Sequence, residues 1–144
     1  PVLFAANHVS YLDITIFGSL IAGSFIAKHE VANWPLFGWL AKLQRSVFID
    51  RRVRSTADQR DSIAARLAAK EALILFPEGT SGDGNRVLPF KSALFSVADH
   101  TATGPVTVQP VSIAYTRVNG MPIGRRYRPL FAWYGAMAMA SADL

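Results

Sequence analysis

The chain has 144 residues, of which 51% are hydrophobic and only 17% are charged. This composition is enough for one buried core and argues against a disordered chain. Cysteine is absent, which excludes disulfides, thiolate catalysis and cysteine-based zinc sites. The formal net charge of +5 fits either an ordinary solvated basic face or an anionic partner, and no nucleic-acid-binding motif accompanies it. We therefore expect a single domain over residues 1–144 and no nucleic-acid partner.

Five segments are typical of strands, because they are short and mostly continuous apolar runs of the kind buried in parallel sheets. They are residues 2–6, 24–27, 46–50, 72–76 and 106–115. Helical patterns lie between them, at residues 10–20, 31–43, 55–73 at the widest and 91–100. The alternation predicts an α/β fold, a single layered domain with a mostly parallel or mixed central sheet flanked by helices.

The first predicted strand is followed by a histidine and a carboxylate, His8 and Asp13. Ser10 and Asp13 have the spacing of a capping box, which predicts a helix that starts at Ser10. Two residues five apart on one helix point roughly 140° away from each other, so a helix through both would separate them. With His8 in the turn before the helix, Asp13 would reach back to the imidazole. The alternatives are a capping role for Asp13 and a structural role for His8.

A second carboxylate, Glu78, lies on a glycine-containing turn within residues 76–80. The segment 77–89 contains three glycines and is typical of a functional loop. The chain has no G-x-S-x-G elbow and no Walker A loop, and no histidine or acidic pattern fits a zinc or calcium site. We therefore expect no metal, and the sequence carries no signature of a covalent serine intermediate.

These motifs together resemble those of the glycerolipid acyltransferases typified by 1-acyl-sn-glycerol-3-phosphate acyltransferase. Four blocks stand in the family's order, at residues 7–13, 47–51, 76–80 and 108–113, and residues 28–38 resemble the segment between the first two. Members of this family usually carry a membrane-associated segment before the first block. The resemblance thus implies that the chain is a fragment of a longer protein, associated with the cytoplasmic face of a membrane.

The resemblance also implies an activity. A fatty acyl group would move from acyl-CoA or acyl-carrier protein to the hydroxyl of a lysolipid, in phospholipid biosynthesis at a membrane surface. The acyl donor is a co-substrate, and no cofactor is implied. His8 would be the general base and Asp13 would orient it. The residues that would bind the acceptor are Arg51, Glu78, Gly79 and Thr80.

The acceptor that the resemblance favours is 1-acyl-glycerol-3-phosphate, but one residue leaves room for another lysolipid. Family members commonly have an arginine directly after the block at residues 76–80, where it suits a phosphate-bearing acceptor, and this chain has Ser81 there. Lyso-ornithine lipid is therefore an alternative acceptor. An alternative of another class is a basic membrane-binding module without catalysis.

Overall fold

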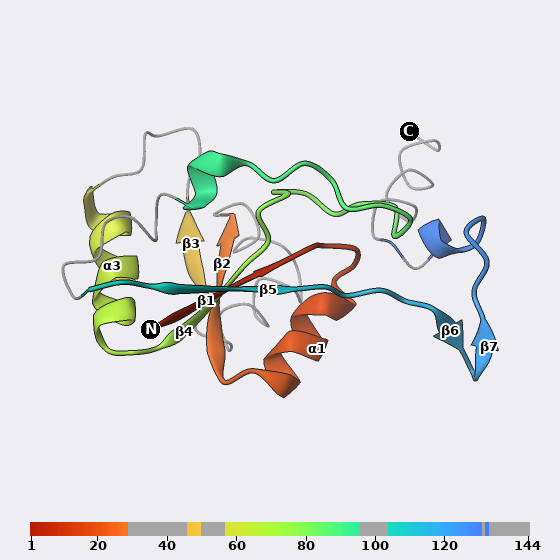
Figure 1. Ribbon diagram of the computed structural model, residues 1–144, viewed down its shortest axis with the longest axis horizontal. Coiled ribbons are helices and arrows are strands. Elements are labelled where there is room, and N and C mark those ends of the chain that lie inside the picture. The colour runs from red at the N-terminus through yellow and green to blue at the C-terminus, as the bar shows by residue number, and fades with distance from the viewer. Residues whose placement is uncertain (29–45, 50–56, 96–103, 131, 133–144) are drawn as a thin grey trace, which may run out of the picture.

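The computed structural model describes residues 1–28, 46–49, 57–95, 104–130 and 132 (Figure 1). Five strands form the main sheet: β1 (Val2–Ala6), β2 (Gly23–Lys28), β3 (Val47–Ile49), β4 (Ala72–Leu75) and β5 (Thr107–Val111). Their order is β3-β2-β4-β1-β5, and every pairing is parallel. The predicted α/β fold is confirmed, with a central sheet that is parallel throughout.

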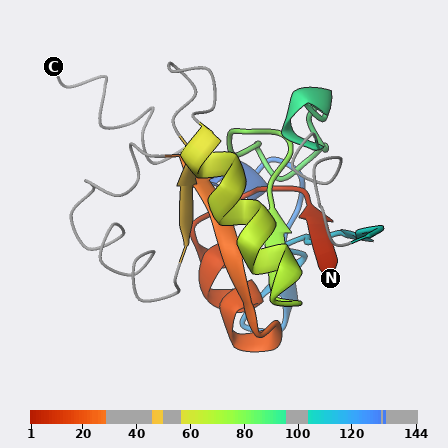
Figure 2. The same ribbon diagram turned by 90° about the vertical axis from the view of Figure 1, so that its left-hand side faces the viewer.

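Helices cover both faces of this sheet. They are α1 (Leu12–Leu20) and α3 (Ala57–Ala68). Successive side chains of a strand point to opposite faces, so Leu73 and Ile74 of β4 lie on opposite sides of the sheet. Leu73 packs in a core cluster with Ile63 and Leu67 of α3, whereas Ile74 packs in a second cluster with Phe17 of α1. The two helices therefore sandwich the sheet (Figure 2).

The termination of α3 follows from the residues after it. Lys70 has a φ of 60°, in the left-handed region, and its N–H donates to the Leu67 carbonyl at 3.0 Å. The N–H of Glu71 donates to the Arg66 carbonyl, also at 3.0 Å, which completes a Schellman-type cap. The helix predicted over residues 55–73 at the widest thus ends at Ala68. The helix predicted over 31–43 lies outside the described residues.

The described part of the segment 91–100, which was predicted to be helical, does not form an α-helix. There the chain forms a single 3-10 turn, η2 (Ser92–Phe95). The N–H of Lys91 donates to the Pro77 carbonyl at 2.9 Å, which ties the segment to the loop after β4. No helix in the described part of the chain is long and apolar enough to cross a bilayer.

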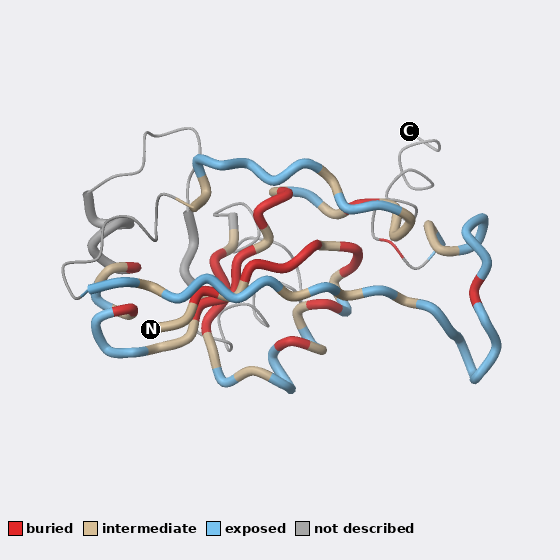
Figure 3. The backbone as a smooth tube through the Cα atoms, in the orientation of Figure 1, coloured by how far each residue is buried: buried red, intermediate tan, exposed pale blue. Residues whose placement is uncertain are grey.

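The chain leaves the sheet earlier than predicted, because β5 ends at Val111 and not at Tyr115. β5 pairs along the whole of β1 and no further, since β1 itself has five residues. Beyond it a two-stranded antiparallel hairpin, β6 (Arg117–Val118) and β7 (Met121–Pro122), leads to the 3-10 turn η3 (Arg128–Leu130). The hairpin and most of β5 are exposed (Figure 3).

One close approach in the sheet generates a stability prediction. Gly23 pairs with Ala72 where β2 begins, and a β-carbon at Gly23 would lie 2.8 Å from the Ala72 carbonyl oxygen. We expect Gly23→Ala to force the two backbones apart and lower the free energy of unfolding by about 1–3 kcal/mol in urea titrations. Gly124→Ala is the matched control, because a β-carbon at Gly124 meets nothing within 4 Å. Equal stability of the two variants would contradict this expectation.

Candidate active site

Three neighbouring strands end at one edge of the sheet, and the residues that follow them form the site. β1 lies between β4 and β5 in the sheet. Parallel strands bring their carboxyl ends to the same edge, which is where open α/β sheets bind ligands. His8 follows β1, Glu78 follows β4 and Tyr115 follows β5, so residues 70 and 102 positions apart come into contact.

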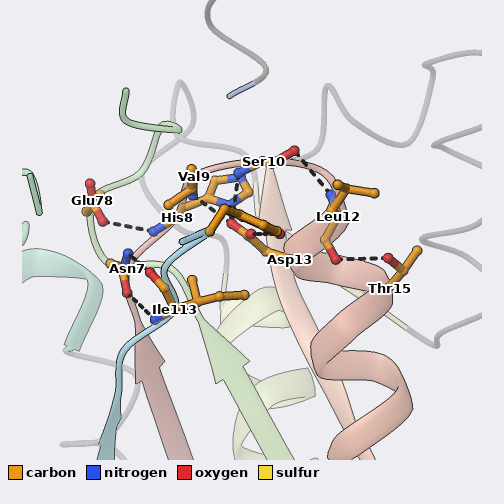
Figure 4. Close-up of polar contacts among 10 residues, drawn as sticks. Asn7, His8, Val9, Ser10, Leu12, Asp13, Thr15, Glu78 and Ile113 are labelled. Atoms are coloured by element: carbon orange, nitrogen blue, oxygen red, sulfur yellow. Dashed lines mark hydrogen bonds and ion pairs between the residues drawn. The ribbon is translucent and has the colours of Figure 1, made fainter. Parts of the chain in front are cut away.

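The two predicted catalytic residues lie within hydrogen-bond distance of each other. His8 Nδ1 is 2.8 Å from Asp13 Oδ2 (Figure 4). His8 lies in the turn before α1 and Asp13 in the first turn of the helix, as the capping-box pattern predicts, although α1 itself begins at Leu12. The Ser10 side chain accepts a hydrogen bond from the Leu12 N–H at 3.4 Å, and Asp13 accepts one from the Ser10 N–H. Asp13 therefore takes part both in the hydrogen bonds at the start of the helix and in the contact with His8.

Asp13 is fully buried and accepts four hydrogen bonds. Its Oδ2 accepts from His8 Nδ1 and from the N–H groups of Val9 at 2.6 Å and Ser10 at 2.9 Å. Its Oδ1 accepts from the hydroxyl of Tyr115 at 2.6 Å. A buried carboxylate is tolerated only when its oxygens are paired in this way, so the local backbone and Tyr115 together keep it in place.

These contacts decide the protonation of the pair. Burial would raise the pKa of Asp13, but the hydrogen bonds from His8, Tyr115, Ser10 and Val9 together lower it below its usual value. An ionised carboxylate only accepts hydrogen bonds, so Nδ1 of His8 must carry the proton. The lone pair of the imidazole is then on Nε2, which is the arrangement a general base requires. Burial and the Asp13 contact raise the pKa of Tyr115, which therefore remains a donor.

The imidazole is also held from one side by an aromatic ring. The His8 and Phe76 rings stack with centroids 4.3 Å apart and planes inclined by 21°. Phe76 in turn contacts the rings of Phe17 and Phe25, which belong to the core under α1. The His8 side chain keeps 18% of its surface exposed. The imidazole is thus anchored to the core while part of its surface stays exposed.

Glu78 is buried and holds the backbone of the site. Its Oε1 accepts the N–H of His8 at 2.8 Å, and its Oε2 accepts the N–H of Leu88 at 2.9 Å. The loop is tied to the same turn again by the N–H of Gly82, which donates to the His8 carbonyl at 2.8 Å. In the described structure Glu78 therefore connects the loop after β4 to the base, while its predicted contact with the acceptor stays a prediction.

Of the other predicted acceptor-binding residues, Gly79 and Thr80 lie within the described part of the chain. Gly79 has a φ of 69° and closes the turn through its N–H, which donates to the Phe76 carbonyl at 3.0 Å. This left-handed conformation explains a glycine at that position. Thr80 is exposed on the same turn. Arg51 lies outside the described residues.

Sequence reasoning missed two residues that complete the site. Tyr115 holds Asp13, and Asn7 binds both backbone groups of Ile113, its Oδ1 accepting at 2.8 Å and its Nδ2 donating at 2.9 Å. Both contacts join the turn after β1 to the segment after β5. Tyr115 stands at the end of a predicted strand, which could have marked it as a candidate site residue. Its contact with Asp13 can be inferred only when β5 is known to lie beside β1.

A histidine–carboxylate pair at the carboxyl edge of a parallel α/β sheet is an arrangement that can activate a nucleophile. The family model described as Acyltransferase matches residues 1–114, and the chain therefore belongs to the acyltransferase family. This confirms the resemblance found in the four sequence blocks.

Relatives with curated names agree. The chain is 52% identical to a lyso-ornithine lipid O-acyltransferase of Brucella abortus over 94% of its length, and 47% identical to one of Rhizobium meliloti over 96%. It is 39% identical to a 1-acyl-sn-glycerol-3-phosphate acyltransferase of Neisseria gonorrhoeae over 67%. These alignments cover 52%, 49% and 38% of the relatives, so the chain spans about half the length of the first two.

A solved structure shares the fold. The crystal structure of the 1-acyl-sn-glycerophosphate acyltransferase from Thermotoga maritima superimposes with a TM-score of 0.55. The match covers 97% of this chain and 66% of the other, with 23% sequence identity.

The contact between Tyr115 and Asp13 generates a pH-dependent prediction. Tyr115→Phe removes one donor from a buried charged acceptor, so we expect a loss of about 1.5–3 kcal/mol in the free energy of unfolding near neutral pH. Asp13 has a lowered pKa in the folded state, so the stability it contributes is present above pH about 4 and is lost as the pH falls further. The difference between wild type and variant should shrink in the same window.

Denaturant titrations from pH 7 to pH 3 measure this difference. Tyr127→Phe is the control, because Tyr127 is 58% exposed. A Tyr115→Phe loss that is independent of pH would show that the hydroxyl does not act through the Asp13 charge.

Proposed function

We propose that this chain carries the catalytic domain of an enzyme that transfers a fatty acyl group from a thioester donor to the hydroxyl of a lysolipid. The observation that carries the proposal is the His8–Asp13 pair, with Nδ1 bound to the buried carboxylate and Nε2 left as the base. Membership of the acyltransferase family and the names of the relatives support the same reaction.

The geometry suits a direct transfer. His8 Nε2 takes the proton of the acceptor hydroxyl as its oxygen attacks the thioester carbonyl, and Asp13 stabilises the imidazolium that forms. When the tetrahedral intermediate collapses, the carbon–sulfur bond breaks and the imidazolium returns the proton to the leaving thiol. Proton transfer of this kind contributes about 10²–10⁴ in rate, so orientation of the reactants and stabilisation of the oxyanion must supply the remainder.

We propose lyso-ornithine lipid as the preferred acceptor. Four relatives that carry this name are 38–52% identical to the chain, and the two with the highest identity match over almost its whole length. Ser81, in place of an arginine suited to phosphate, is consistent with this choice. 1-Acyl-glycerol-3-phosphate is the second candidate, favoured by the Neisseria relatives. Arg51, Glu78, Gly79 and Thr80 are the residues proposed to bind the acceptor.

The proposed donor is acyl-CoA or acyl-carrier protein, and the proposed place of reaction is the cytoplasmic face of a membrane. A lysolipid acceptor is itself an amphiphile that resides at such a surface. The net charge of +5 supports attraction to anionic lipid or to a phosphate-rich donor.

Substitution of the pair tests the mechanism. We expect His8→Ala to abolish acyl transfer while the fold is retained, because the base is lost. Asp13→Asn should reduce kcat by about tenfold or more, since control of the tautomer is lost. The measurement is thiol release from acyl-CoA on addition of a lysolipid, with the full-length protein.

Thr15→Ala provides the matched control for both variants. Thr15 is exposed on α1 two residues from Asp13, and within the described part of the chain its hydroxyl donates to the Leu12 carbonyl of the same helix. The control should keep full activity. Near-complete activity of His8→Ala would rule out the mechanism, whereas the absence of transfer by the wild type would favour the alternative of a basic membrane-binding module.

Position 81 tests the choice of acceptor. Ser81→Arg would add a bidentate donor where related enzymes commonly have one, so we expect it to raise the rate ratio of 1-acyl-glycerol-3-phosphate to lyso-ornithine lipid. Both acceptors are assayed at subsaturating concentration with one labelled donor. Ser81→Ala is the control for loss of the hydroxyl. An unchanged ratio in Ser81→Arg would show that this position does not select the acceptor.

A further inference from the structure

The β6–β7 hairpin carries two exposed apolar side chains at its tip. Val118 and Met121 are directly opposite each other in the antiparallel pairing, so their side chains lie on one face of the hairpin. Val118 is 37% exposed and Met121 is 69% exposed. Between them Asn119 and Gly120 have φ values of 49° and 79°, and two positive values are typical of a tight type I′ turn. The turn therefore holds the two apolar side chains side by side at the tip.

The sequence around this tip is basic and contains no acidic residue. Residues 116–130 include four arginines and neither aspartate nor glutamate. Three of these arginines are exposed, and no ion pair among the described residues involves them: Arg117, Arg125 and Arg126. The segment after the hairpin also exposes Tyr127 and Leu130. Exposed apolar and aromatic side chains interspersed with arginine are typical of segments that lie at the surface of an anionic bilayer.

The base of the hairpin is fixed beside the candidate active site. Tyr115, a member of the site, stands two residues before the first residue of β6. At the end of β7, Ile123 is buried and its N–H donates to the Thr116 carbonyl at 2.8 Å. Asn85, on the loop after β4, donates from Nδ2 to the Arg125 carbonyl at 3.1 Å. The hairpin therefore projects from the part of the molecule that holds the site, at the end away from α3 (Figure 1).

We propose that the β6–β7 hairpin is the surface through which this domain binds an anionic phospholipid bilayer. Val118 and Met121 insert among the lipids, and the exposed arginines lie at the phosphates. An acidic protein would complement the arginines alone, whereas a bilayer offers both phosphate and hydrocarbon. The inference rests on the proposed function in one respect: a lysolipid acceptor resides in a bilayer, and a hairpin fixed beside the base turns the catalytic edge of the sheet toward it.

A fluorophore at the tip of the hairpin tests the proposal in the full-length protein. The chain has no cysteine, so Met121→Cys provides a unique attachment point within it, once any cysteine outside these residues is replaced. A nitrobenzoxadiazole label there reports transfer from water to lipid by a blue shift and a rise of its emission. We expect both with vesicles that contain phosphatidylglycerol, and a much smaller change with phosphatidylcholine alone.

Leu20→Cys is the matched control for the label. Leu20 is also apolar and is 76% exposed, but it stands at the end of α1 that lies away from the catalytic turn. A label at this position should stay in water when vesicles are added.

Neutral substitutions test the contribution of charge in the labelled protein. Arg126→Gln should raise the lipid concentration for half of the emission change about fivefold, as expected for one basic side chain at an anionic surface. This difference should disappear at about 1 M salt, where charges are screened within about 3 Å. Lys70→Gln is the control, because Lys70 is exposed before β4, at the opposite edge of the sheet. Melting temperatures show whether each variant keeps its fold.

Transfer assays connect this surface to the reaction. Met121→Asp places a charge at the tip and should lower transfer to a lysolipid in vesicles about tenfold or more, because apolar burial is lost and a charge resists leaving water. Transfer to a short-chain acceptor dissolved in water should fall much less. Leu20→Asp adds the same charge away from the hairpin and should change neither rate.

Four outcomes would overturn the proposal. They are unchanged emission at position 121 with anionic vesicles, an equal change at position 20, a label at position 121 that is already shielded before vesicles are added, and a change caused by acyl-carrier protein but not by vesicles. The third would show that another part of the protein or a second copy covers the tip. If the wild type acylates neither acceptor, the proposed function fails, and the label still decides on the hairpin.

Discussion

The buried carboxylate of Asp13 is the constraint on which the site depends. An ionised group with no exposed surface needs its oxygens paired, and here two backbone N–H groups, an imidazole and a phenol provide the hydrogen bonds. The N–H groups of Val9 and Ser10 can both reach it only if the chain turns sharply between β1 and α1. The same turn places the His8 side chain next to the Asp13 carboxylate. The charge compensation of Asp13 and the geometry of the His8–Asp13 pair are therefore consequences of one local conformation.

This local origin explains why the pair could be predicted from the sequence. His8 and Asp13 are five positions apart, and the capping pattern at Ser10 is also local, so spacing alone placed both side chains correctly. β1 was predicted to the residue, because a short apolar run before a turn leaves little freedom. For the helix predicted over residues 91–100, the sequence could not show that its described start is a 3-10 turn. Its described start is held instead by the Pro77 carbonyl, a contact made across the loop.

Contacts between strands that are distant in the chain could not be derived in this way. That Glu78 lies at His8 depends on β4 pairing with β1, and a sequence pattern does not give the order of strands in a sheet. The same holds for Tyr115, which reaches Asp13 because β5 pairs with the other edge of β1. For Glu78, sequence and family resemblance indicated a substrate contact. The structure adds a backbone N–H contact to each carboxylate oxygen, and the substrate contact stays a prediction.

The 102-residue separation between Asp13 and Tyr115 has a consequence for the order of folding. During synthesis the N-terminal segment emerges first, so the turn after β1 and most donors to Asp13 exist well before Tyr115 is made. Until β5 docks on the open edge of β1, the carboxylate lacks one donor and Asn7 lacks both of its backbone partners. Closure of this long loop is therefore the step that completes the hydrogen bonding of Asp13 and Asn7.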